Sequence, residues 1–304
     1  MIPEPSARNF FAEHSAVTSP GRHASIFREL PHQVGELVDL IQRLVVYDVV
    51  APEFYGFTVP EKRRDEIHMR RVEQILDGIL ALDNRPLSSA RPIERRLAGR
   101  CHTFTLLLLA MLREKKIPAR ARCGFGSYFN PPKFEDHWVC EYWNAAEARW
   151  VLVDTQFDET WRAQLHIAHD ILDVPRDRFL VAGEAWTQCR TDRANASMFG
   201  IEFAHLWGLW FVAGSLVRDV AALNKKEMRP WDVWGAQPPP NHELAPEELR
   251  FFDSLSELTR HPDASFDELR ALFQSDERLA VPETVFNALL NRPEPTVLTS
   301  PRTA

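Results

Sequence analysis

The chain has 304 residues, 45% of them hydrophobic, which is sufficient for one large domain or two smaller ones with a buried core. Its formal net charge is −7, and basic stretches such as Lys62–Arg71 and Arg91–Arg100 are interleaved with acidic residues, so no nucleic acid or other polyanion is indicated as a partner. The four cysteines show no paired spacing, and the first residues lack a basic stretch followed by an apolar run. We therefore expect a reduced, cytoplasmic protein.

The N-terminal third has the apolar spacing of helices. Leucines, isoleucines and valines recur at helical intervals in Ile26–Val50 and again in Arg64–Leu82. Pro52 and Pro60 separate the two stretches, and proline interrupts helices. This part of the chain is therefore predicted to be mainly helical.

A further predicted helix begins at Cys101 and continues through a leucine-rich stretch to Leu112. It is apolar almost all round, which is typical of a buried helix, and it ends at Arg113–Lys116, just before Pro118. Cys101 then lies in the first turn. There, unpaired backbone N–H groups and the positive end of the helix dipole favour a thiolate over a thiol.

Two strands follow the helix. Glu135–Trp143 and Arg149–Gln156 are largely apolar on both faces, which predicts central strands of an antiparallel hairpin. If the turn centres on Ala145-Ala146, His137 faces Asp154 directly, and their Cβ atoms are about 4.5–5.5 Å apart. The same register pairs Val139 with Leu152 and leaves Cys140 on the opposite face.

These residues can form a nucleophilic site. Asp154 would hold one ring nitrogen of His137, and the other nitrogen would point at the sulfur of Cys101. The neighbouring His102 projects about 100° away from Cys101 around the helix, so it is a poor base and could instead line the pocket.

At these residues the sequence resembles the transglutaminase-like superfamily of cysteine enzymes, related in fold to the papain group, over about residues 91–158. In that family the nucleophile opens a helix, and a stretch like Leu112–Arg120 follows, then a strand with the His and a strand like Trp150–Asp154. The resemblance implies an α+β fold with helices packed on an antiparallel sheet. It also implies a triad of Cys101, His137 and Asp154 that forms an acyl-thioester.

Two features depart from the family pattern. Trp138 follows the His immediately, whereas many members have the tryptophan one residue later. In the crosslinking transglutaminases a tryptophan upstream of the Cys helps to stabilise the oxyanion, but this chain has no Trp before Trp138. The backbone N–H of the Cys is one donor. The second is left open: Arg95, Arg96 or Arg100 could supply it or could bind an anionic substrate.

The remainder of the chain is predicted to be mainly helical. Phe199–Leu223 is apolar but contains Glu202, Arg218 and Asp219, so we expect a core helix rather than a membrane span. The stiff run Pro238–Pro240 is the predicted domain break, between residues 1–237 and a small helical region at 241–304. That region is expected to hold helices near Pro246–Thr259, Ser265–Gln274 and Pro282–Asn291.

The predicted activity is cysteine-dependent acyl chemistry on a peptide, protein or small-molecule donor, without a cofactor. No acidic loop has the spacing of a calcium-binding EF-hand. Whether water or an amine accepts the acyl group is open. The rival interpretations are a catalytically inactive binding module of the same fold and a metallohydrolase that uses His102, His137 and Asp154.

Overall fold

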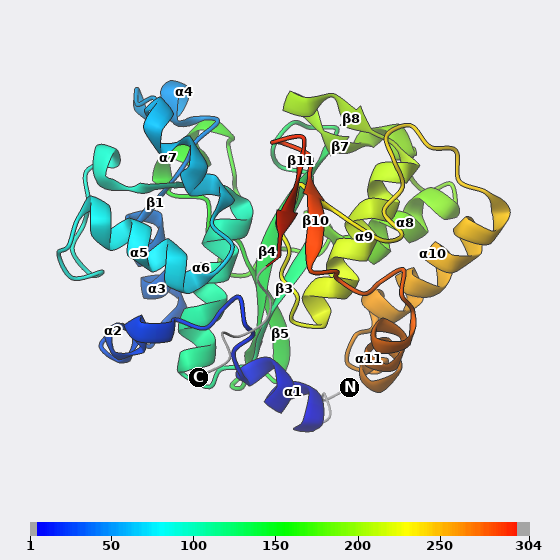
Figure 1. Ribbon diagram of the computed structural model, residues 1–304, viewed down its shortest axis with the longest axis horizontal. Coiled ribbons are helices and arrows are strands. Elements are labelled where there is room, and N and C mark those ends of the chain that lie inside the picture. Colours follow the sequence, from blue (N-terminus) through cyan, green and yellow to red (C-terminus); the bar gives the residue numbers. More distant parts are fainter. Residues whose placement is uncertain (1–4, 297–304) are drawn as a thin grey trace. The chain divides into compact units, whose positions relative to one another are not determined.

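The computed structural model describes residues 5–296 and confirms the α+β class (Figure 1). The chain divides into two compact units. Unit 1 comprises residues 121–138 and the chain from 175 onward, together with the segment up to residue 7. Unit 2 comprises residues 8–120 and 139–174.

Unit 2 contains the helices predicted for the N-terminal third. Leu37 and Ile41 on one helix, and Ile75 and Ile79 on another, are at most 1% exposed, as their helical spacing requires. The helices of this unit are α2 (Ala24–Arg28), α3 (Val34–Gln42), α4 (Ala51–Tyr55), α5 (Val72–Leu82), α6 (Cys101–Glu114) and α7 (Glu159–Gln164), and α1 (Pro5–Ala12) ends in it.

The first predicted helical stretch also contains a strand. β1 (Val45–Tyr47) follows α3 and pairs in parallel with β2 (Leu97–Gly99), which leads directly into α6. The second stretch, Arg64–Leu82, begins within a 3₁₀-helix (Glu61–His68) that precedes α5. The first prediction was therefore too long at its C-terminal end.

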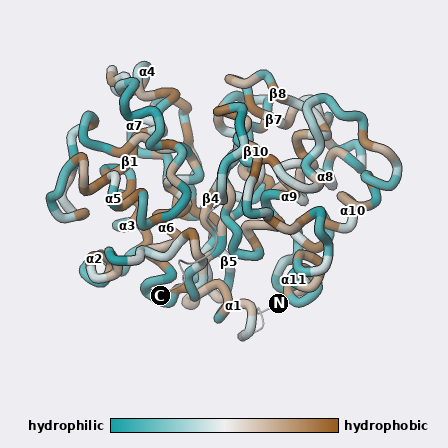
Figure 2. The backbone as a smooth tube through the Cα atoms, in the orientation of Figure 1, coloured by the Kyte–Doolittle hydropathy of each residue, from teal (hydrophilic) through white to brown (hydrophobic). Residues whose placement is uncertain are grey.

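Helix α6 is buried from Cys101 to Arg113, as its sequence predicts. Its leucine run is drawn in brown in Figure 2, and the charged residues at its end are teal. The buried guanidinium of Arg113 donates to the Ala119 carbonyl (3.1 Å) and to Thr18 Oγ1 (2.9 Å) within the unit.

The larger sheet has the strand order β6-β3-β4-β7-β8, and β5 also pairs with β4. β3 and β4 each run from one unit into the other, since the boundaries fall after residues 120 and 138. The pairs β3–β6, β4–β5 and β7–β8 are antiparallel, as predicted, whereas β4 and β7 are parallel. The strands are β3 (Ala119–Gly126), β4 (Phe134–Asn144), β5 (Arg149–Val153), β6 (Phe179–Val181), β7 (Phe199–Ile201) and β8 (Leu206–Trp207).

The register of the β4–β5 hairpin differs from the prediction. Cys140 pairs with Val153 and Asn144 with Arg149, so the loop contains residues 145–148. The Asn144 side-chain oxygen accepts from the N–H groups of residues 146 and 147, and Ala148 adopts a φ of 51°, which lengthens the turn.

The predicted direct pairing of His137 with Asp154, and of Val139 with Leu152, is therefore wrong. The ladder is shifted by two residues, and Leu152 pairs with Glu141 instead. β5 ends at Val153, and the Asp154 N–H donates to the Ile171 carbonyl at 2.8 Å.

Unit 1 packs helices α8 (Ala182–Arg190), α9 (Leu209–Leu223), α10 (Pro246–Arg260) and α11 (Phe266–Ser275) together (Figure 1). A buried ion pair joins Arg122 on β3 to Asp219 on α9 at 2.9 Å, and the same guanidinium donates to the Thr259 carbonyl on α10 at 2.8 Å. The boundary expected at Pro238–Pro240 therefore lies within unit 1. Within the region predicted as a second domain at 241–304, helix α10 contacts α8 and α9, and helix α11 contacts α9, and both α8 and α9 precede the proline run.

Two predicted helices of unit 1 differ from the structure. The core helix α9 begins at Leu209 rather than Phe199, because Gly208 has a φ of 124° and the preceding residues form the β7–β8 hairpin. The stretch predicted as a helix over Pro282–Asn291 instead contains strand β10 (Thr284–Asn287) followed by a turn. Strand β10 pairs with β9 (Asp232–Val233) and with β11 (Arg292–Pro295) in a small antiparallel sheet.

Among residues 5–296, no helix combines the length and the apolar character that crossing a membrane would require.

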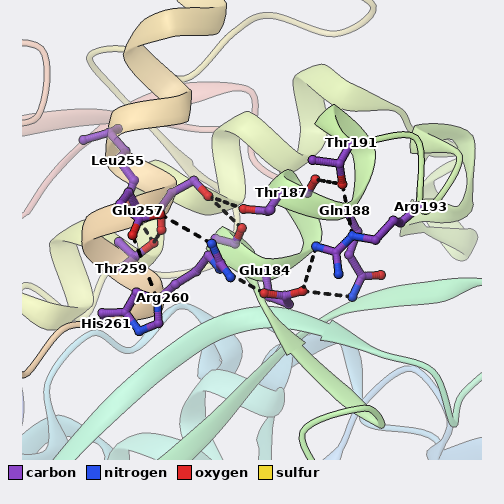
Figure 3. Close-up of polar contacts among 12 residues, drawn as sticks. Glu184, Thr187, Gln188, Thr191, Arg193, Leu255, Glu257, Thr259, Arg260 and His261 are labelled. Atoms are coloured by element: carbon purple, nitrogen blue, oxygen red, sulfur yellow. Dashed lines mark hydrogen bonds and ion pairs between the residues drawn. The ribbon is translucent and has the colours of Figure 1, made fainter.

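The contact between α8 and α10 is close and partly polar. Arg260 donates to Glu184 at 2.9 Å, and Glu184 also accepts from Gln188 at 3.2 Å (Figure 3). At Gly183 the helices are nearest, since a Cβ there would overlap the Thr259 hydroxyl and lie 2.9 Å from the Ser256 carbonyl oxygen. Only glycine fits this position without a shift of backbone.

We expect Gly183→Ala to lower the free energy of unfolding by about 1–3 kcal/mol, because the added methyl group overpacks the α8–α10 contact. The matched control is Gly214→Ala on α9, where the nearest atoms to an added Cβ are 3.8 Å away. That change should be neutral or stabilising by up to about 1 kcal/mol. Denaturant unfolding of the full chain measures both, and equal effects would contradict the close packing.

Candidate active site

Cys101 is the first residue of α6 and is 6% exposed. Strand β2 leads into the helix at Cys101, and Gly99, which lacks a Cβ, allows β2 to lie close to the helix. A Cβ at Gly99 would lie 2.7 Å from Val45 Cγ1 and 2.9 Å from Thr103 Cβ. The thiol is therefore placed at the N-terminus of a buried helix, where backbone N–H groups lack intrahelical partners.

Arg100 is bound to a carboxylate beside this thiol. Its Nε and Nη2 donate to the two carboxylate oxygens of Asp48 at 2.9 and 3.1 Å. Burial disfavours the charged guanidinium, but the hydrogen bonds from this pair prevail and leave the pKa of Arg100 raised. The pair joins the residue after β1 to the N-cap of α6.

The other candidates near Cys101 have structural contacts. Arg95 Nη1 donates to the Leu82 carbonyl at 2.9 Å. Arg96 donates to the carbonyls of Arg91 and Gln42. His102 is 3% exposed. A role for Arg95, Arg100 or His102 in binding substrate stays a prediction.

His137 lies on β4 in unit 1 and is 1% exposed. Its ring centroid is 4.8 Å from that of Phe129, 6.2 Å from Tyr128 and 6.3 Å from Phe179. Within unit 1 the imidazole is thus enclosed by aromatic rings. The adjacent Trp138 is equally buried.

Asp154 lies in unit 2, directly after β5, and is fully buried. One of its carboxylate oxygens accepts from the backbone N–H of Gln156 at 3.2 Å. This short turn fixes the carboxylate relative to the strand end. Unit 2 therefore holds Cys101 and Asp154, whereas His137 belongs to unit 1, two residues before β4 enters unit 2 at Val139.

The remaining cysteines are unsuited to act as nucleophiles. Burial raises the pKa of the Cys123 and Cys140 thiols, and it raises that of Cys189 to about 12. Cys140 lies three residues after His137 on β4, hence on the opposite face. Cys123 and Cys140 fit the structural role expected of buried thiols.

Two polar residues close in sequence to the predicted triad were not predicted as candidates. Glu135 precedes His137 by two residues on the same face of β4, and Gln156 follows Asp154 by two. Both are at most 9% exposed, and both have a side-chain oxygen with no hydrogen-bond partner in the described part of the chain. In the sequence both residues lie among other polar residues, so no local pattern distinguishes them.

Glu135 has a strongly perturbed carboxyl group. Burial raises its pKa to about 7, against a hydrogen bond from the Glu202 N–H (2.9 Å) that favours the charged form. In the segment that the structure describes, no cluster of three His, Cys, Asp or Glu side chains is arranged to hold a metal ion.

Comparisons with known proteins bear on this site. Residues 70–155 match the family model of the transglutaminase-like superfamily, which confirms the resemblance predicted over about residues 91–158. Cys101, His137 and Asp154 all lie inside the matched segment. No curated protein matches the chain. A crystal structure of a proposed cysteine protease from Cytophaga hutchinsonii is 19% identical, covers 48% of this chain and 40% of its own, and has a TM-score of 0.31.

We expect Glu135→Gln to change how stability depends on pH. The pKa of Glu135 is about 7 in the folded protein against 4.5 ordinarily, so the folded state binds the proton more tightly than the unfolded state does. Wild-type stability should therefore fall as pH rises through this window, by up to about 3 kcal/mol. The variant lacks this loss, so its gain in Tm over wild type should be larger at pH 8 than at pH 5.

The control is Glu283→Gln, which changes an exposed carboxylate. Its Tm difference from wild type should be the same at both pH values. A Glu135→Gln gain that is equal at pH 5 and pH 8 would contradict the assignment of the raised pKa to Glu135.

Proposed function

We propose that this transglutaminase-like segment is the catalytic part of a cysteine enzyme that forms an acyl-thioester on Cys101. The observation that carries the proposal is the placement of Cys101 as the first residue of a buried helix inside the matched segment. Of the four thiols, it is the one at a helix start, beside backbone N–H groups that lack intrahelical partners.

His137 is the proposed base and Asp154 its orienting carboxylate. The observed β4–β5 ladder pairs residues 140–144 with residues 149–153 and includes neither His137 nor Asp154. The two roles are therefore proposed from the order of these residues within the matched segment.

The proposed reaction has two steps. Cys101 gives its thiol proton to His137, its sulfur bonds to the carbonyl carbon of an amide, ester or thioester, and the π electrons of the carbonyl move to its oxygen. That oxyanion collapses and expels the leaving group, which takes the proton from His137. Water or an amine then attacks the acyl-thioester, gives its proton to His137, and releases the product and the thiolate. No cofactor is needed.

The first test is selective labelling. At pH 7, iodoacetamide should modify Cys101 at least about tenfold faster than the other three cysteines, because a thiolate reacts and burial keeps those thiols protonated. A peptide mass map of the protein after short exposure gives each rate. Cys101→Ala should remove the fast site and abolish acylation by p-nitrophenyl acetate. Equal rates at all four cysteines would contradict the nucleophile, and would favour the inactive binding module.

The second test concerns the partners of the thiolate. His137→Ala should slow labelling of Cys101 at pH 7 by about tenfold or more, since it removes the proposed base that takes the thiol proton. Asp154→Asn should act in the same direction but less, because the imidazole remains. His32→Ala, at an exposed site of unit 2, is the control and should leave the rate unchanged. A wild-type rate in His137→Ala would remove His137 from the proposed site.

A further inference from the structure

The segment directly after Asp154 contains buried polar atoms that have no partner. Gln156 and Thr155 are each 2% exposed. In the described part of the chain, neither the nitrogen nor the oxygen of the Gln156 amide makes a hydrogen bond, and the same holds for the Thr155 hydroxyl. A buried amide without partners is costly, so it calls for a specific explanation.

The backbone of this segment is fully anchored, so the unpaired amide is not a sign of a loose loop. The Gln156 N–H donates to the Asp154 carboxylate at 3.2 Å, and the Gln156 carbonyl accepts from the Asp158 N–H at 3.2 Å. The next residue, Phe157, is fully buried and packs its ring against Trp161. The chain therefore holds Gln156 in place and leaves only its side chain without a partner.

Contacts within unit 2 connect this segment to the start of α6. The Gln42 side chain donates to the Thr155 carbonyl at 3.3 Å, and the Gln42 carbonyl accepts from Arg96 Nη1 at 3.1 Å. Arg96 immediately precedes β2, which ends two residues before Cys101. Gln42 thus joins the segment that carries Gln156 to the segment that carries the nucleophile.

We propose that the Gln156 side chain contacts the substrate and donates its amide N–H to the acyl oxygen that becomes negative when Cys101 attacks. This inference rests on the function proposed above. It supplies the second oxyanion donor that the sequence lacks, because no Trp precedes Trp138 and the Nε and Nη2 groups of Arg100 are bound to Asp48. A donor held in a buried site needs no reorganisation when the charge develops, which is what makes such donors effective.

The test compares two reactions of the same thiol. Acylation of Cys101 by p-nitrophenyl acetate develops an oxyanion, whereas alkylation by iodoacetamide does not. In Gln156→Met the rate of acylation should fall by about 10²-fold, the usual effect of removing an oxyanion donor. The alkylation rate of Cys101 should stay within about twofold, since the thiolate and its partners are intact.

Stability provides an independent readout. Because Gln156→Met removes an unpaired buried amide and keeps a side chain of similar length, its Tm should equal or exceed that of wild type. Gln156→Glu keeps the acceptor oxygen but loses the N–H donor, so it should not restore acylation. Gln164→Met, on an exposed position of α7, is the matched control and should change neither rate nor Tm. Gln156→Leu replaces Gln156→Met if the latter does not fold.

Several outcomes would overturn the inference. Wild-type acylation in Gln156→Met would exclude a donor role. A lowered Tm with equal losses of acylation and alkylation would show a structural role, such as binding a buried water. A wild-type Cys101 that is alkylated selectively but not acylated would also refute it while leaving the nucleophile assignment standing. Failure of the proposed function looks different, because Cys101 would then show no selective alkylation at all.

Discussion

The geometry of unit 2 depends on the close approach of β2 to the first turn of α6. Gly99 is packed against Val45 and Thr103, and the Arg100–Asp48 ion pair fastens the N-cap of the helix to the residue after β1. Because α6 is buried along its length, its start cannot move without opening the core of the unit. The position of Cys101 is therefore set by the packing of β2 and α6 within unit 2.

Local patterns were sufficient to predict the parts of the fold that depend on local interactions. The helix from Cys101 and the two strands after it follow from an apolar run, charged residues at the helix end and β-rich sequence. The register did not follow, since it depends on the Asn144 side chain and on the positive φ of Ala148. The strand at Thr284–Asn287 was also missed, because its pairing with β9 involves residues about fifty positions away, beyond any local window.

The part of the candidate site that could be predicted is the part in which the residue types themselves indicate the chemistry. A Cys, a His and an Asp in the family order identified the matched segment. The unpaired side-chain atoms of Glu135 and Gln156 could not be predicted, because a missing hydrogen-bond partner leaves no mark in the sequence. Whether a buried polar atom has a partner is a property of the tertiary structure, and no spacing in the sequence encodes it.

Glu135 and Gln156 differ from other buried polar groups of the chain in their hydrogen-bond partners. Arg122 is paired with Asp219 and Arg229 with Asp232, at 2.9 Å in each case, so these buried charges are compensated. Two residues before His137 and two residues after Asp154, a buried side-chain oxygen instead has no partner in the described part of the chain, at a cost in stability. Buried atoms without a partner also occur elsewhere, as at Arg91 Nε and Arg218 Nε, so the missing partner alone does not identify a site. It is the position of Glu135 and Gln156 within two residues of His137 and Asp154 that makes both residues candidates for the proposed site.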